Sequence, residues 1–172
     1  MRLLALMVLV GCSGGEGKAP RDLDALDSTT NPGKRSEILA LGSEAHNTMV
    51  LFGGNNGPIV NQVPAGQFLD DTWLFSPGEG WTEVQTDVQP SARGRYSFDL
   101  DPNTDSGLLF GGRFREGTSG DYTLRNDLWR FDLLTKVWAE VPRPEGAPWP
   151  APRSLHAGGL VGDEYLVFGG LG

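Results

Sequence analysis

Three short apolar runs in the chain each end in a pair of glycines. They are MVLFGG at 49–54, GLLFGG at 107–112 and YLVFGG at 165–170. The first glycines of these pairs stand 58 residues apart each time, at Gly53, Gly111 and Gly169. An apolar run that stops at glycines is typical of a strand that leaves a sheet through a tight turn. The spacing therefore predicts the same strand in three successive units.

Two further segments recur in the same phase. DDTWLF at 70–75 matches NDLWRF at 126–131, and WTEV at 81–84 matches WAEV at 138–141. Within the first of these segments, Asp71 and Asp127 occupy the same position, which indicates a structural role rather than a unique active site. Arginines recur as well, at the ends of PSAR and PAPR and before the first glycine pair: Arg35, Arg93 and Arg153. So many matches in one order indicate an internal repeat.

Each unit divides into four short strands separated by turn residues. The first strand follows the arginine (EILAL at 37–41, YSFDL at 96–100, LHAGGL at 155–160), and the second ends at the glycine pair. The third and fourth are the two tryptophan-containing segments. Apolar residues lie on both faces of the third strand, so one four-stranded unit cannot bury them alone. The pattern predicts an all-β protein of stacked sheets.

The order arginine, glycine pair, Asp-x-Trp and a later tryptophan resembles the kelch repeat over residues 35–172. The resemblance implies β-propeller blades of four antiparallel strands, with the later tryptophans, Trp81 and Trp138, packed against a neighbouring blade. It also implies that glycine pairs close the second strands: Gly53, Gly54, Gly111, Gly112, Gly169 and Gly170. The common tyrosine of the third strand is replaced by Phe75 and Phe131, which removes a hydroxyl group and keeps the packing.

The repeat predicts two full blades, at 35–92 and 93–152, and a half blade at 153–172. Closed propellers have four to eight blades, so a ring of such units needs roughly 350 to 400 residues. We therefore expect the incomplete propeller to be the N-terminal portion of a longer one, or to be completed by another chain. A truncated gene product without function is an alternative.

The first twelve residues, MRLLALMVLVGC, combine a basic start, an apolar run and a cysteine after a small residue. The run is too short to span a bilayer. It resembles the lipobox of bacterial lipoproteins, which implies a signal peptide at 1–11, a lipid on Cys12 and a flexible tether over 12–34. Export and anchoring to the bacterial cell envelope, on the outer membrane or the periplasmic face, would follow. An ordinary secretory signal with a chance cysteine is the alternative.

Charge and candidate chemistry exclude several function classes. The net charge is −8, without a basic stripe, so nucleic-acid binding is not expected. The acidic stretch at 99–107 resembles the start of a calcium loop but lacks its glycine and glutamate, and a hairpin turn explains it better. His46 and His156 have no cysteine partners or nucleophile motif, and the glycine-rich turns lack a phosphate-binding ending. No metal or cofactor is expected.

The two connections between second and third strands are unusually long, at 55–69 and 113–125. Long loops on a rigid scaffold often carry recognition. The second loop holds residue types that are favoured at protein contacts: Arg113, Arg115, Tyr122 and Arg125. We expect a scaffold that binds a protein or a glycan, although an unselective surface loop is the alternative.

An enzyme is the competing class, because some kelch propellers, such as galactose oxidase, are enzymes. The copper site of that family needs tyrosine, histidine and a cross-linked cysteine. The only cysteine here is Cys12, so the sequence favours a protein without enzymatic activity.

Overall fold

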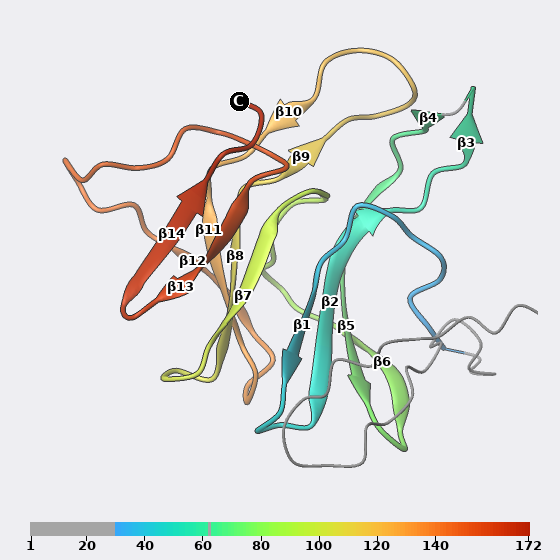
Figure 1. Ribbon diagram of the computed structural model, residues 1–172. Helices are drawn as coiled ribbons and strands as arrows, with labels where there is room; N and C mark the ends of the chain where they lie inside the picture. The colour runs from blue at the N-terminus through green and yellow to red at the C-terminus, as the bar shows by residue number, and fades with distance from the viewer. Residues whose placement is uncertain (1–29, 62) are drawn as a thin grey trace, which may run out of the picture.

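The computed structural model describes residues 30–61 and 63–172, and in these residues the chain is all-β (Figure 1). The first blade is a four-stranded antiparallel sheet in the order β1-β2-β5-β6. Its strands are β1 (Ala40–Ser43), β2 (Thr48–Asn55), β5 (Phe68–Ser76) and β6 (Gly80–Val84). The described residues contain no helix that could cross a membrane.

The second blade repeats this topology, with the order β7-β8-β11-β12. Its strands are β7 (Ser97–Asp101), β8 (Ser106–Phe110), β11 (Leu128–Asp132) and β12 (Trp138–Val141). A third sheet holds only β13 (Ala157–Val161) and β14 (Glu164–Phe168). The predicted fold, two full kelch-type blades and half a blade in an open array, is confirmed.

The main core lies between the first and second blades. Apolar side chains of both sheets meet there, among them Phe52, Leu74, Phe98, Phe131 and Trp138. A smaller cluster, Leu51, Trp73, Phe75 and Trp81, covers the opposite face of the first blade. Each sheet thus has two apolar faces, as the sequence predicted, and one of them is buried by the next blade.

The glycine pairs connect neighbouring blades through the backbone. Gly53 has a φ of +53°, and a Cβ atom there would lie 2.6 Å from the carbonyl oxygen of Leu69. Gly53 lies inside β2, at the register shift between Phe52 and Gly54, and only glycine fits there, because a side chain would be strained and would clash. The next residue, Gly54, donates its N–H to the carbonyl of Arg93 at the start of the second blade (2.9 Å). Gly112 donates to Arg153 in the same way, also at 2.9 Å.

The first strands begin later than the sequence predicted, at Ala40, Ser97 and Ala157. The residues two positions after each arginine adopt a positive φ: Glu37 (62°), Arg95 (59°) and Leu155 (59°). They link the blades, because Arg95 N–H donates to the Glu37 carbonyl (2.9 Å) and Leu155 N–H donates to the Arg95 carbonyl (3.1 Å). This left-handed turn delays the start of the strand.

Both long connections contain a short hairpin that the sequence did not indicate. β3 (Ile59–Val60) pairs with β4 (Val63–Pro64), and β9 (Arg113–Phe114) pairs with β10 (Thr123–Leu124). The two hairpins lie at the same end of the blades, above the glycine pairs (Figure 1). We call the segments 55–61, 63–67 and 113–124, which carry these hairpins, the loop face.

Candidate functional site

The loops of the two blades contact each other directly on the loop face. Gly66 N–H donates to the carbonyl of Gly117 (2.6 Å), and Gly117 N–H donates back to Gly66 (3.2 Å). Phe68, at the start of β5, packs against Phe114 and Tyr122, with ring centroids 5.9 and 6.4 Å apart. The second loop is therefore docked on the first by backbone pairing and an aromatic cluster, and it forms a fixed platform.

Three of the four residues predicted for binding lie together on this platform. The guanidinium carbon of Arg113 lies 4.0 Å from the centroid of the Tyr122 ring, and that of Arg115 lies 4.4 Å from it. Both contacts are cation–π interactions, which hold cations over an aromatic face. Arg125, the fourth residue, joins the blades through its backbone instead: its N–H donates to Gly112 (2.9 Å) and its carbonyl accepts from Arg153 (3.0 Å).

The two arginines beside Tyr122 differ in their polar partners. Arg113 donates to both carboxylate oxygens of Glu37, at 3.0 and 3.1 Å, and the Glu37 side chain is only 2% exposed. This ion pair fixes the second loop to the first blade. In the described part of the chain, the Nε and Nη2 atoms of Arg115 are buried and have no hydrogen-bond partner. Of the two arginines beside Tyr122, Arg115 is therefore the one whose N–H groups are not all hydrogen-bonded within the fold.

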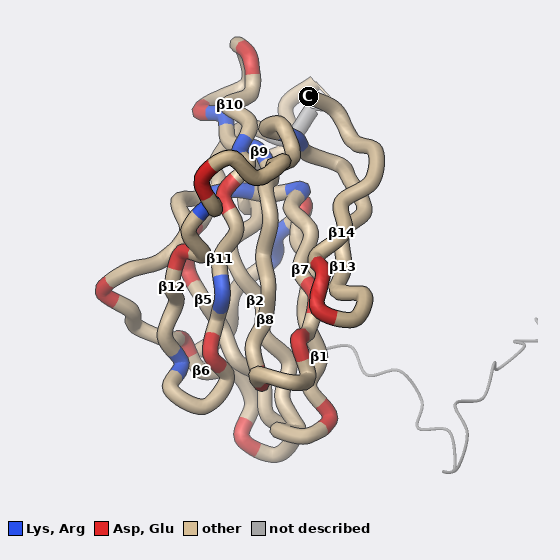
Figure 2. The backbone as a smooth tube through the Cα atoms, turned by 90° about the vertical axis from the view of Figure 1, so that its left-hand side faces the viewer, with Lys and Arg blue, Asp and Glu red and all other residues tan. Residues whose placement is uncertain are grey.

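Figure 2 shows how charge is distributed along the blades. Most lysine and arginine segments lie toward the loop face, whereas the turns at the opposite end are mostly acidic. Those turns carry Glu44, Glu79, Asp101, Asp105, Asp132, Asp163 and Glu164. The loop face itself is balanced, because Arg113 and Arg115 are accompanied by the exposed Glu116 and Asp121, so it is less acidic than the turns at the opposite end.

The recurring arginines and aspartates form ion pairs within each full blade. Arg35 contacts both carboxylate oxygens of Asp71 (2.7 and 3.0 Å), and Arg93 contacts those of Asp127 (2.6 and 2.8 Å). The indole N–H of the following tryptophan donates to the same carboxylate, from Trp73 at 2.6 Å and from Trp129 at 2.7 Å. We call this unit the Arg-Asp-Trp triad.

The triad explains why the two aspartates are structural. Burial alone would raise the pKa of Asp127, but the hydrogen bonds and charge of Arg93, with the Trp129 indole, hold that pKa below its ordinary value. The carboxylate is therefore a permanently charged anchor and not a proton carrier. Both partners recur in phase in the sequence, so the pairing could have been inferred from the equal spacing of arginine and aspartate.

A buried histidine lies at the contact between the second and third sheets. His156 Nε2 is 2.9 Å from the hydroxyl oxygen of Ser97, and Tyr165 donates its hydroxyl to the same oxygen (3.0 Å). His156 and Ser97 are only 8% and 2% exposed. The serine is thus closed off from substrate, and no carboxylate contacts His156 Nδ1 among the described residues. This is not a nucleophile–base pair for catalysis.

Tyr96 occupies the position equivalent to His156 at the contact between the first two blades. Its hydroxyl donates to the carbonyls of Phe52 and Leu39, and Leu39 occupies the position equivalent to Ser97. Burial raises the pKa of Tyr96, and burial raises the pKa of Tyr165 to about 12. Both tyrosines are neutral hydrogen-bonding groups that connect adjacent sheets.

Stability is expected to fall as the pH drops below the ordinary histidine pKa of about 6.5. Burial, together with the charge of Arg153, lowers the pKa of His156 in the folded chain. The unfolded chain then binds more protons in this range, so protonation favours unfolding. Urea unfolding between pH 8 and pH 5 measures the effect.

The matched variant is His156→Tyr, which copies Tyr96 and cannot be protonated. The wild-type chain should lose stability relative to this variant on acidification, while the contribution of His46 cancels because both proteins retain it. Parallel pH curves for the two proteins would show that His156 does not carry the effect.

The calcium-like stretch is occupied by turn interactions. Asp101 accepts the Asn103 N–H (3.0 Å) and the Thr104 hydroxyl (2.6 Å), and the Thr104 hydrogen bond is the main reason that the pKa of Asp101 is lowered. Asp99 accepts the N–H of Leu160 on β13 (2.8 Å), which ties the second sheet to the third. No cluster of three or more metal-ligating side chains occurs in residues 30–61 and 63–172.

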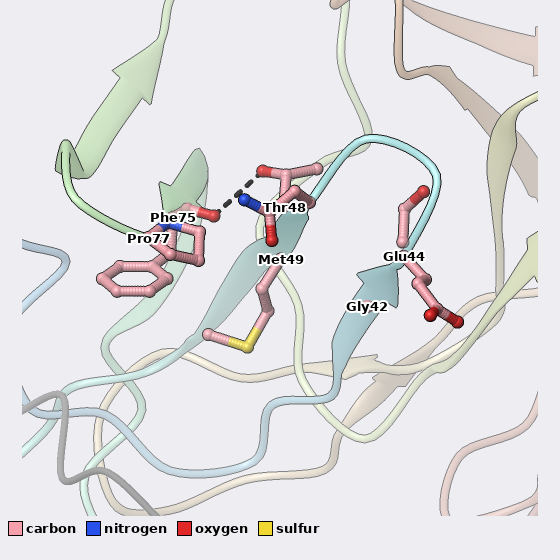
Figure 3. A pocket seen from close by; sticks show the side chains of 8 residues that line it. Gly42, Glu44, Thr48, Met49, Phe75 and Pro77 are labelled. Atoms are coloured by element: carbon pink, nitrogen blue, oxygen red, sulfur yellow. Dashed lines mark hydrogen bonds between the residues drawn. The ribbon is translucent and has the colours of Figure 1, made fainter. Parts of the chain in front are cut away.

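A hollow of about 430 Å³ lies at the acidic end of the first blade (Figure 3). Met49 and Phe75 form its apolar wall, and the Thr48 hydroxyl donates to the Phe75 carbonyl (3.0 Å). Glu44 is the only charged residue that lines it. Ser43 and Thr48 supply hydroxyl groups, but the hollow is lined by no histidine or basic side chain beside its one carboxylate, and the Thr48 hydroxyl is already used by Phe75.

The repeat and the sheet topology together define an incomplete array of propeller-type blades, two with four strands and one with two strands in the described residues. No protein-family model matches the chain. It is similar to the leucine-zipper-like transcriptional regulator 1 homolog of Drosophila melanogaster, with 30% identity over 127 residues, and to host cell factor 2 of Homo sapiens, with 33% identity over 137 residues. These matches cover 73% and 72% of this chain, but only 12% and 16% of the relatives.

A solved structure supports the same fold. The structure of YjhT matches with a TM-score of 0.59 over 82% of this chain and 39% of that chain. Sequence identity is 12%, so this likeness concerns the fold alone. The structural comparison therefore agrees with the fold class that the sequence predicted.

Proposed function

We propose that the chain is a protein-binding scaffold and that its loop face is the recognition surface. The observation that carries the proposal is the arrangement around Tyr122, where two arginines stack on one aromatic ring and Glu37 fixes one of them to the first blade. Aromatic and arginine side chains on a rigid platform are the residue types that dominate protein contacts.

The partner that fits this surface is a protein with exposed carboxylates. Arginine side chains favour carboxylate partners, and Tyr122 supplies contact area at a low entropy cost. The loops are already paired through Gly66 and Gly117, so little ordering is needed on binding. A glycan partner, the other expectation from the sequence, has no comparable support from the charges here.

Replacing Arg115 by glutamate is expected to reduce partner capture at least tenfold, since hot-spot residues contribute about 2 kcal/mol or more. Capture from an envelope extract is measured by quantitative mass spectrometry with immobilised wild-type and variant proteins. Arg143→Glu is the control, because it makes the same charge change at an exposed arginine outside the loop face. Equal capture by the Arg115→Glu and wild-type proteins, or equal loss in both variants, would refute the role of the loop face.

The proposed location is the cell envelope, through a lipid on Cys12. Cys12 and the tether lie outside the described residues, so this part of the proposal is supported by the sequence pattern alone. Incorporation of a fatty-acid analogue into the wild-type chain, and its absence from Cys12→Ala, is the expected result. Unchanged labelling of the variant would contradict the anchor.

A further inference from the structure

The two contacts between the first strands of neighbouring sheets differ in polarity. β7 contacts β1 on one side and β13 on the other. At the first of these contacts, Leu41 and Tyr96 belong to one buried apolar cluster. At the second, the equivalent positions, counted from the repeated arginines, hold Asp99 and His156. The contact between the second blade and the third sheet is therefore polar where the contact between the two blades is apolar.

His156 is enclosed in the second contact without a full set of hydrogen bonds. It is 8% exposed, and its ring packs edge-on against Phe110, with centroids 5.5 Å apart. Its Nε2 lies 2.9 Å from the hydroxyl oxygen of Ser97, whereas its buried Nδ1 makes no hydrogen bond of ordinary geometry with the described residues. A charged imidazole donates from both nitrogens, so protonation would leave a buried N–H unpaired here.

The charges around the imidazole do not compensate for its burial. The charged and titratable side chains in and beside this contact are Glu37, Arg95, Asp99, Arg153 and Tyr165. The two carboxylates already have partners, since Glu37 pairs with arginines and Asp99 accepts the N–H of Leu160. Burial and the positive charge of Arg153 lower the pKa of His156, and the backbone of Phe110 offsets this only in part. The closed contact therefore favours the neutral imidazole.

We propose that the contact between β7 and β13 is an acid-sensitive joint, which protonation of His156 opens while the contact between the first two blades stays closed. Opening gives the imidazole access to water, so the open form takes up a proton more readily than the closed form, and mild acid shifts the equilibrium towards it. The joint borders the second loop, because Arg153 N–H donates to the Arg125 carbonyl (3.0 Å). This inference does not rest on the function proposed for the loop face.

Backbone amides that donate across each contact can report its opening. Leu155 donates to the Arg95 carbonyl (3.1 Å) and Leu160 donates to the Asp99 carboxylate (2.8 Å), both across the second contact. Across the first contact, Arg95 donates to the Glu37 carbonyl (2.9 Å). Exchange of these three N–H groups therefore separates the opening of one contact from the unfolding of the whole chain.

The test measures amide hydrogen exchange of the full chain by NMR at pH 7.5 and pH 5.5, relative to an unstructured peptide at the same pH. We expect protection of the Leu155 and Leu160 N–H groups to fall about tenfold between these pH values, because the open form carries an imidazole with the ordinary pKa of about 6.5. Protection of the Arg95 N–H should stay unchanged.

Three variants assign the effect to one side chain. His156→Tyr copies Tyr96, and His156→Gln keeps a polar side chain beside Ser97 without a titrating group, so the fall in protection should disappear in both. His46→Gln removes the only other histidine and should leave the fall intact. A fall that persists in the His156 variants, or an equal fall at Arg95, would overturn the proposal. A circular dichroism spectrum of each variant checks that the sheets are retained.

Discussion

Asparagine in place of Asp127 is expected to lower the free energy of unfolding by about 3 kcal/mol, because breaking a buried ion pair leaves the remaining charge uncompensated. The side chain of Arg93 is 1% exposed, and that of Asp127 is 23% exposed. With the carboxylate gone, the buried guanidinium keeps its contacts to Gly111 and Ser91 but loses the negative charge between it and Trp129. Urea unfolding at pH 7 measures the loss.

The control for this variant is Asp70→Asn. Asp70 is exposed and adjacent to the blade-one triad, so its neutralisation should change stability by no more than about 0.5 kcal/mol. The pH dependence gives a second readout. Since the pKa of Asp127 is lowered in the folded chain, its contribution is present above the unfolded value of about 3.9 and is lost as the pH falls through the folded value. The wild-type and Asp127→Asn curves should converge in acid, and a constant gap would contradict the ion-pair explanation.

The sequence predicted the sheets well because a repeat compares each strand with its own copy. The 58-residue spacing aligned DDTWLF with NDLWRF, and the structure places these segments in the equivalent strands β5 and β11. The prediction did not depend on intrinsic strand preference, which is strongly modified by context. The predicted starts of the first strands were too early. Glu37, Arg95 and Leu155 adopt a positive φ before each strand, and none of them is a glycine, the residue type that usually indicates this conformation.

The candidate site was predicted only in part. A long loop with arginine and tyrosine indicated recognition, but its geometry depends on contacts that have no equivalent in the repeat. Arg113 pairs with Glu37, 76 residues earlier in the chain, while the positions equivalent to Glu37 are Arg95 and Leu155. A periodic pattern cannot reveal a pair that occurs once. The same holds for Gly66 and Gly117, which meet through their backbones without a side-chain signal.

Alanine in place of Trp138 is expected to lower the free energy of unfolding by about 3 to 5 kcal/mol, the usual cost of removing a buried large aromatic side chain. Trp138 is 2% exposed, and its ring lies 5.0 Å from Phe131 in its own blade and 5.2 Å from Phe52 in the first blade. Its indole N–H donates to the fully buried hydroxyl of Thr72 on β5 (2.9 Å). The variant therefore loses packing at the blade contact and leaves a buried hydroxyl unpaired.

Trp81 is the earlier copy of the same repeat position. Comparing the two tryptophans separates packing within one sheet from packing between blades. Trp81 contacts Phe75 in its own sheet (centroids 5.3 Å apart), and its cluster is confined to the first blade. If Trp138 mainly stabilises the contact between blades, Trp81→Ala should lower the free energy of unfolding clearly less than Trp138→Ala does. Urea unfolding measures both variants. Trp138→Phe should fall between them, since it keeps the ring and loses the hydrogen bond to Thr72, a loss of about 1 to 3 kcal/mol for a buried unpaired group. Equal costs for Trp81→Ala and Trp138→Ala would mean that the ring stabilises its own sheet, and that the contact between blades depends on the glycine-pair backbone bonds and the Tyr96 hydroxyl instead.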